Sequence, residues 1–107
     1  MKRGDLITVV MPGAFGKPRP AVVVQADDFD ALDTVTFLPF TSDVVPARAF
    51  RVTVEPSVTN GLRELSQVMA DKCSTLRLDK VGPVIGRLSD LEIAQVDRAL
   101  AVFLGFV

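Results

Sequence analysis

The sequence contains no histidine, tryptophan or tyrosine, and it has a single cysteine, Cys73. Without histidine the chain can form no imidazole general base, no Ser-His or Cys-His catalytic pair and no histidine ligand to a metal. One cysteine permits neither a disulfide within the chain nor a multi-cysteine zinc site, which is typical of the reducing cytoplasm. Stacking on a nucleobase would have to use phenylalanine or the plane of an arginine.

Long apolar runs and an excess of one charge are also missing. The longest apolar stretch, residues 99–107, is far shorter than the ~20 residues that span a bilayer, and the run at residues 6–11 is too short for a signal peptide. We therefore expect a cytoplasmic protein without a membrane contact. Twelve basic and 13 acidic residues give a net charge of −1, which excludes a general nucleic-acid coat but allows a local basic groove.

What the chain does have is a high apolar content for its size. Its 107 residues suit one domain, residues 1–107, with one modest core. Hydrophobic residues make up 49% of the sequence, which is more than such a core can hide. This excess predicts a subunit interface, and the apolar end at residues 103–107 predicts that it joins two copies as a homodimer.

The first two-thirds of the chain has the composition of short β-strands. Runs rich in Val, Ile, Thr and Phe are separated by Pro, Gly and Asp, which favour turns. The run at residues 21–24 does not alternate and predicts a strand buried on both faces. We predict strands at residues 6–10, 21–25, 35–39, 50–54, 65–70 and 84–88.

The last segment changes to the period of a helix. Ser89 and Glu92 have the spacing of a capping box, and apolar residues then recur every three or four positions until Gly105, a natural helix stop. The sequence therefore predicts a mainly β (α+β) fold. It consists of a small, strongly bent antiparallel barrel of five to six strands with a C-terminal amphipathic helix.

Three polar stretches carry the chemistry. Arg19 stands between Pro18 and Pro20 where a buried strand begins, which suits binding of a phosphate, although this spacing alone is more typical of a solvated hairpin loop with the arginine in a surface ion pair. Thr41 and Ser42 end the next strand and offer hydroxyl donors, or simply form a turn.

The third stretch covers residues 66–72. Alternation places Gln67, Met69 and Asp71 on one face of a strand, and Asp71 with Lys72 can also be a solvated charge pair.

Taken together, these stretches resemble a known family. The sequences MKRGDLI at residues 1–7, KPRPAVVVQ at 17–25, PFTS at 39–42 and LSQV at 65–68, with further matches at 82–88 and 96–105, are similar to MazF/PemK toxins. These proteins are the ribonuclease components of bacterial toxin–antitoxin systems. The resemblance covers essentially the whole chain.

The resemblance implies an SH3-like barrel that works as a homodimer without a cofactor or metal. It implies sequence-specific cleavage of single-stranded mRNA through attack by the RNA's own 2′-OH, and inhibition by a cognate acidic antitoxin of the MazE kind. The catalytic residues implied are Arg19, Thr41 and Asp71, with Asp71 as the candidate base. The residues expected to contact RNA are Phe15, Lys17, Ser42, Arg51, Gln67 and Lys72.

One departure and two alternatives accompany this interpretation. Many relatives have a basic residue where this chain has Met69, which argues against a second cation there. CcdB-like gyrase poisons share the barrel and the terminal helix but act through a terminal Trp-Gly-Ile, and this chain has no tryptophan. An SH3-like binding module without catalytic activity is the other alternative.

Overall fold

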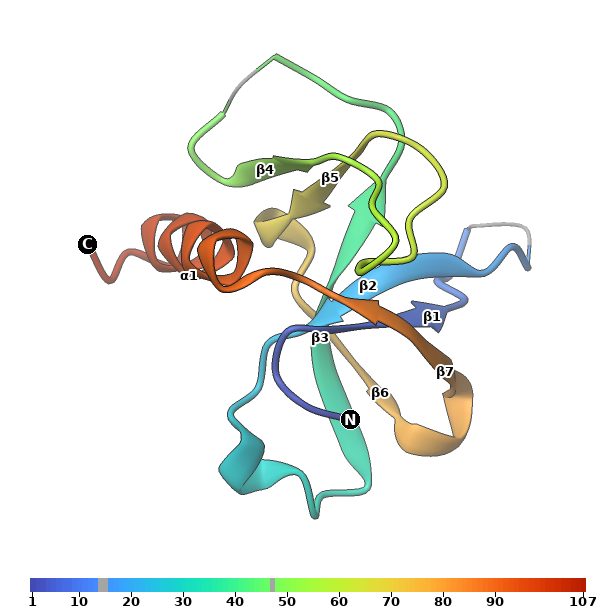
Figure 1. Ribbon diagram of the computed structural model, residues 1–107. Helices are drawn as coiled ribbons and strands as arrows, with labels where there is room; N and C mark the ends of the chain where they lie inside the picture. Colours follow the sequence, from blue (N-terminus) through green and yellow to red (C-terminus); the bar gives the residue numbers. More distant parts are fainter. Residues whose placement is uncertain (14–15, 47) are drawn as a thin grey trace.

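The computed structural model describes residues 1–13, 16–46 and 48–107, and Figure 1 shows its course. Over these residues the chain forms one seven-stranded antiparallel sheet and one α-helix. Three short 3-10 helices connect strands. The elements are β1 (Asp5–Val9), β2 (Arg19–Val23), η1 (Asp27–Phe29), β3 (Thr34–Thr41), β4 (Arg51–Val54), β5 (Ser66–Met69), η2 (Ala70–Lys72), β6 (Ser74–Arg77), η3 (Leu78–Lys80), β7 (Val81–Arg87) and α1 (Asp90–Leu104).

The sheet bends around its longest strand, β3. Strand order is β4-β5-β3-β2-β1-β7, and β6 also pairs with β3. β6 takes the first half of β3, from Thr34 to Phe37, whereas β5 takes its end, at Phe40 and Thr41. Because β3 changes partner along its length, the sheet coils into a barrel-like form that is not strictly closed, with β3 crossing its middle (Figure 1).

The predicted bent antiparallel fold is confirmed, but the strand count was too low. We did not predict β6, whose four residues include only one apolar side chain, the half-buried Leu76. β7 begins at Val81, three residues earlier than predicted. The prediction began later because Gly82 and Pro83 are residue types typical of turns. β7 stands at the end of the strand order, where proline is tolerated, and its register with β1 shifts beside this segment.

The core has two parts, and β2 contributes to both. Val22 packs in a cluster with strands β3–β5 and helix α1, and Ala21 and Val23 pack in a second cluster with β1 and β3. All three are at most 2% exposed, so the predicted strand buried on both faces is confirmed. This central strand gives Arg19, its first residue, a rigid base.

The predicted helix and its caps are also confirmed. The Ser89 hydroxyl accepts the Glu92 N–H at 3.1 Å, the Glu92 carboxylate accepts the Ser89 N–H at 2.9 Å, and Gly105 ends the helix with φ 82°. Helix α1 lies beside β4 and η2 (Figure 1) and buries Val96 and Ala99 in the core. Over the described residues no helix has the length and apolar character needed to cross a membrane.

Candidate active site

Arg19 and Thr41 come together because of the register between β2 and β3. Ala21 is paired with Pro39 in this antiparallel ladder. Arg19 lies two residues before Ala21 and Thr41 two residues after Pro39, at the neighbouring ends of the two strands, and both residues line the same two cavities. The sequence prediction that a strand-start cation and a strand-end hydroxyl could serve one phosphate thus has a geometric basis.

Two cavities flank this pair of residues. Arg19, Thr41 and Ser42 line both of them. The first cavity has a volume of about 490 Å³ and continues toward β7 and the loop before β5. The second has a volume of about 430 Å³ and continues toward Met69 and Lys72. The two strand ends therefore form a ridge with room for an extended polymer on either side.

The two central side chains are available for a ligand. Arg19 is exposed and makes no salt bridge or side-chain hydrogen bond with another residue in the described part of the chain. Thr41 Oγ1 accepts the Asp43 N–H at 3.1 Å, which orients the hydroxyl and leaves its proton for an acceptor in the cavity. A guanidinium beside an oriented hydroxyl is suited to hold the oxygens of a phosphate.

Asp71 has a different environment from the one we predicted. The strand ends at Met69, and the 3-10 turn Ala70–Lys72 takes Asp71 off the strand face. Both of its carboxylate oxygens accept hydrogen bonds from Arg51, at 3.0 and 3.1 Å. The side chains of Asp71 and Arg51 are only 16% and 14% exposed, and neither residue lines either cavity.

The ion pair with Arg51 keeps the Asp71 carboxyl group ionised. Burial raises the pKa of its carboxyl group, but the Arg51 hydrogen bonds, a backbone hydrogen bond and the charges of Arg51 and Lys72 outweigh burial and lower the pKa below 3.8. Arg51 also lies over the Phe50 ring, with 5.7 Å between its guanidinium carbon and the ring centre. A carboxylate held in this way is a poor proton acceptor, and its arginine is not free to bind RNA.

Gln67 also makes internal contacts. It is 1% exposed, its Oε1 accepts the Val45 N–H at 3.1 Å, and its Nε2 donates to the Val45 carbonyl at 2.9 Å and to Thr53 Oγ1 at 3.2 Å. In this conformation the Gln67 side chain is not accessible to RNA. It holds the segment that follows Thr41 through its hydrogen bonds to the Val45 backbone.

The remaining predicted contacts lie near the ridge or outside the described residues. Ser42 lines both cavities, Lys72 lines the second, and Lys17 is exposed two residues before Arg19. Phe15 lies outside the described residues.

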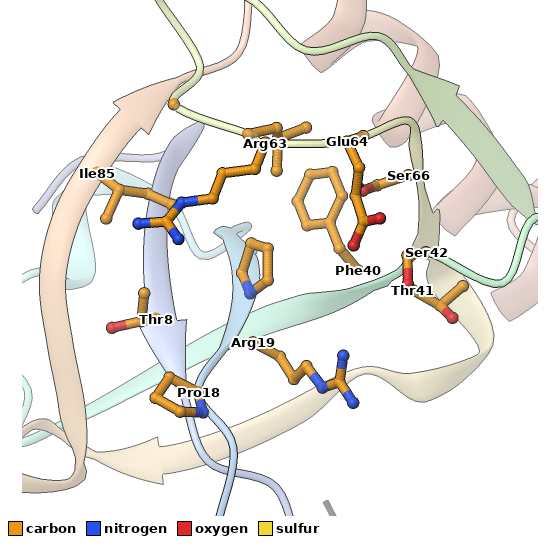
Figure 2. A pocket seen from close by; sticks show the side chains of 13 residues that line it. Thr8, Pro18, Arg19, Phe40, Thr41, Ser42, Arg63, Glu64, Ser66 and Ile85 are labelled. Carbon is orange, nitrogen blue, oxygen red and sulfur yellow. The ribbon is translucent and has the colours of Figure 1, made fainter.

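Sequence reasoning missed Arg63 and Glu64. Both line the first cavity, and Figure 2 shows them on the loop above it, with Arg63 leaning toward Ile85 and the Glu64 carboxylate directed toward Thr41 and Ser42. No local motif marks these residues. They reach the site because β5, which follows their loop, pairs with β3 at Phe40 and Thr41.

Comparison with known proteins assigns this chain to a family. The family model for the PemK-like, MazF-like toxin of type II toxin–antitoxin systems matches residues 2–104. The chain belongs to the MazF/PemK toxin family. It is 42% identical, over 98% of its own length and 97% of the relative's, to a protein of Mycolicibacterium smegmatis described as probable endoribonuclease MazF. This match favours neither the gyrase poison nor the inactive module.

Solved structures agree on the MazF fold. A mycobacterial endoribonuclease in complex with its cognate antitoxin superposes with a TM-score of 0.84 at 21% identity, covering 100% of this chain and 97% of that one. A MazE–MazF structure from Deinococcus radiodurans gives a TM-score of 0.77 at 24% identity, covering 98% and 96%. The barrel-like sheet and terminal helix are therefore those of MazF toxins.

Proposed function

We propose that residues 1–107 form one MazF-like toxin domain that cuts single-stranded mRNA at specific short sequences in the cytoplasm. The observation that carries the proposal is the Arg19–Thr41 ridge between two cavities. It occurs in a chain that is 42% identical to a probable endoribonuclease. The ridge would hold the scissile phosphate, and the cavities would hold the nucleotides on its two sides.

In the proposed reaction the RNA supplies its own nucleophile. The 2′-oxygen forms a bond to phosphorus, the bond from phosphorus to the 5′-oxygen breaks, and the products are a 2′,3′-cyclic phosphate and a 5′-hydroxyl. Arg19 donates two hydrogen bonds to the charged pentacovalent phosphorane, and Thr41 donates one to a non-bridging oxygen. Water takes the proton of the 2′-OH and returns one to the departing 5′-oxygen, because the Asp71 carboxylate is occupied by Arg51.

The test is cleavage of a labelled single-stranded RNA by the purified protein. We expect cleavage to continue in excess EDTA, because every step uses side chains, water and the RNA itself. The 3′ ends should carry a cyclic phosphate and the 5′ ends should be free hydroxyls. Products with a 5′-phosphate, or loss of all activity in EDTA, would contradict the mechanism.

We also expect a homodimer. Phe103, Leu104, Phe106 and Val107 are 48–77% exposed at the end of α1, and such an apolar group needs a cover. Sedimentation at micromolar concentration should give a species of twice the chain mass of 11.5 kDa. A single species at the chain mass would contradict this expectation.

The proposed toxin dimer would be bound by an acidic antitoxin, a segment of which folds across the ridge. Lys17 and Arg19 are both exposed, two residues apart where the chain enters β2, and their charges suit an acidic segment. Lys17→Glu should weaken binding of the cognate antitoxin at least about tenfold, because it sets a negative charge against that segment.

Titration of the antitoxin onto both variants by calorimetry measures the effect. Lys80→Glu is the matched control, since Lys80 is an exposed lysine on η3 outside both cavities. Equal affinity of the Lys17→Glu and Lys80→Glu proteins would show that the antitoxin does not cover this loop.

A further inference from the structure

We propose that the first cavity is a subsite for one nucleobase next to the scissile phosphate, where Glu64 and Arg63 select a base with an exocyclic amino group over uracil. The inference rests on the proposed RNA cleavage and adds the base chemistry of one subsite to it. It follows from the shape of this cavity, the rigidity of its loop and the charge of Glu64.

The walls of the cavity suit a flat base. Pro20 and Ile85, both half-buried, supply apolar surface, and the buried Phe40 also lines the cavity. Arg63 and Glu64 stand above it (Figure 2). A volume of about 490 Å³ lies within the range of small-molecule sites. Unstacked RNA bases are commonly bound in this way, against apolar surface with polar groups at the edge of the base.

The loop that carries the two residues is fixed on both sides. The buried Asn60 accepts the N–H groups of Ser57 and Leu62 at 3.0 and 2.9 Å. Gly61 has φ 73°, and a side chain there would run into the carbonyl of Ile85. Leu62 before the pair and Ser66 after it are buried. Arg63 and Glu64 are therefore presented to the cavity from a rigid support, as a selective site requires.

The charge of Glu64 has no structural use in the described part of the chain. It makes no salt bridge or side-chain hydrogen bond there, unlike Asp71, which Arg51 neutralises. A carboxylate next to the phosphate site repels the RNA backbone and so lowers affinity for RNA of any sequence. A base that offers hydrogen-bond donors to the carboxylate offsets this cost.

The donors and acceptors of the four bases decide the selection. Cytosine, adenine and guanine carry an amino group that donates to Glu64, and each also has ring or carbonyl acceptors for Arg63. Uracil has one ring N–H between two carbonyl oxygens, which a carboxylate repels. One well-formed pair of this kind contributes roughly 5- to 150-fold discrimination between bases. We expect uracil to be disfavoured by that factor at one position beside the cut.

The experiment is cleavage of a single-stranded RNA with a randomised ten-nucleotide window, followed by sequencing of both product ends. The wild-type protein should show a position next to the cut from which uracil is excluded. Glu64→Gln, whose amide both donates and accepts, should reduce that discrimination to within about threefold and leave preferences at the other positions unchanged. Glu55→Gln is the matched control, since Glu55 is an exposed carboxylate outside both cavities.

Four outcomes would overturn the inference, and they differ in what else they affect. Cleavage without discrimination against uracil beside the cut, or discrimination that survives in Glu64→Gln, removes the subsite and leaves the ribonuclease intact. An equal loss of rate for all sequences in Glu64→Gln assigns Glu64 to proton transfer instead. A folded wild-type protein that cuts no RNA overturns the proposed function, and this subsite with it.

Discussion

Arg19→Ala should lower the rate of RNA cleavage by at least about 10²- to 10³-fold, which is the effect of removing one donor that stabilises an anionic transition state. Arg19 can supply two such donors to the phosphorane, so the upper end of this range is expected. The fold should survive, because the side chain is exposed and no salt bridge ties it to another described residue. Thr41→Ala should lose less, since its hydroxyl is a neutral donor and Ser42 stands beside it in both cavities.

The measurement compares initial rates on one RNA, with thermal melting to verify that each variant is folded. Arg77→Ala is a suitable control, since it removes an exposed arginine on β6 that pairs only with the exposed Asp79 among the described residues. Its rate should equal that of the wild type. A well-folded Arg19→Ala protein that still cuts RNA within tenfold of the wild type would remove Arg19 from the active site.

The features that the sequence predicts well have local causes. The capping box at Ser89 and Glu92 and the stop at Gly105 are formed by residues within one turn of each other, and both are present. The doubly buried β2 follows from an unbroken apolar run, whose burial needs only a layer on each face. In these segments the sequence signal lies within a few neighbouring residues, so it can be recognised without knowledge of the sheet order.

The features that were missed depend on contacts distant in sequence. β6 has little apolar character, and its strand conformation comes from pairing with the first half of β3, which is more than 35 residues earlier in the sequence. Arg63 and Glu64 enter the candidate site only through the pairing of the next strand with β3. The alternating pattern predicted a strand that continues beyond Met69, but the chain forms a 3-10 turn there. In this turn the Asp71 carboxylate accepts hydrogen bonds from Arg51. Register and strand ends are set by the whole sheet, and short sequence patterns do not contain them.

The Arg51–Asp71 pair leads to the second prediction, which concerns stability more than catalysis. Asp71→Asn keeps the shape of the side chain but removes its charge from two hydrogen bonds with Arg51. Hydrogen bonds to charged groups contribute ~1.5–3 kcal/mol, and Asn can still accept one. We therefore expect the free energy of unfolding at pH 7 to fall by about 1–3 kcal/mol, measured by urea denaturation.

The effect should depend on pH in a definite direction. The folded state lowers the pKa of Asp71 below 3.8, so the carboxylate stabilises the protein fully above that pH. Its contribution is lost as the pH falls through the lowered pKa, because the folded protein then also binds the proton. The difference in stability between wild type and Asp71→Asn should accordingly shrink below pH 3.8 and be constant from pH 5 to 7. A difference that instead grows on acidification would contradict the pairing with Arg51.

Cleavage by the same variant decides whether Asp71 is a base. Its carboxylate faces Arg51 and lines neither cavity, so a folded Asp71→Asn protein should cut RNA within about tenfold of the wild type, below the 10²–10⁴-fold contribution of a general base. The assay is run at a temperature where melting shows both proteins folded, which separates lost activity from lost structure. A loss of cleavage rate of a hundredfold or more in the folded variant would identify Asp71 as the base. Arg51 would then have to release the Asp71 carboxylate when RNA binds.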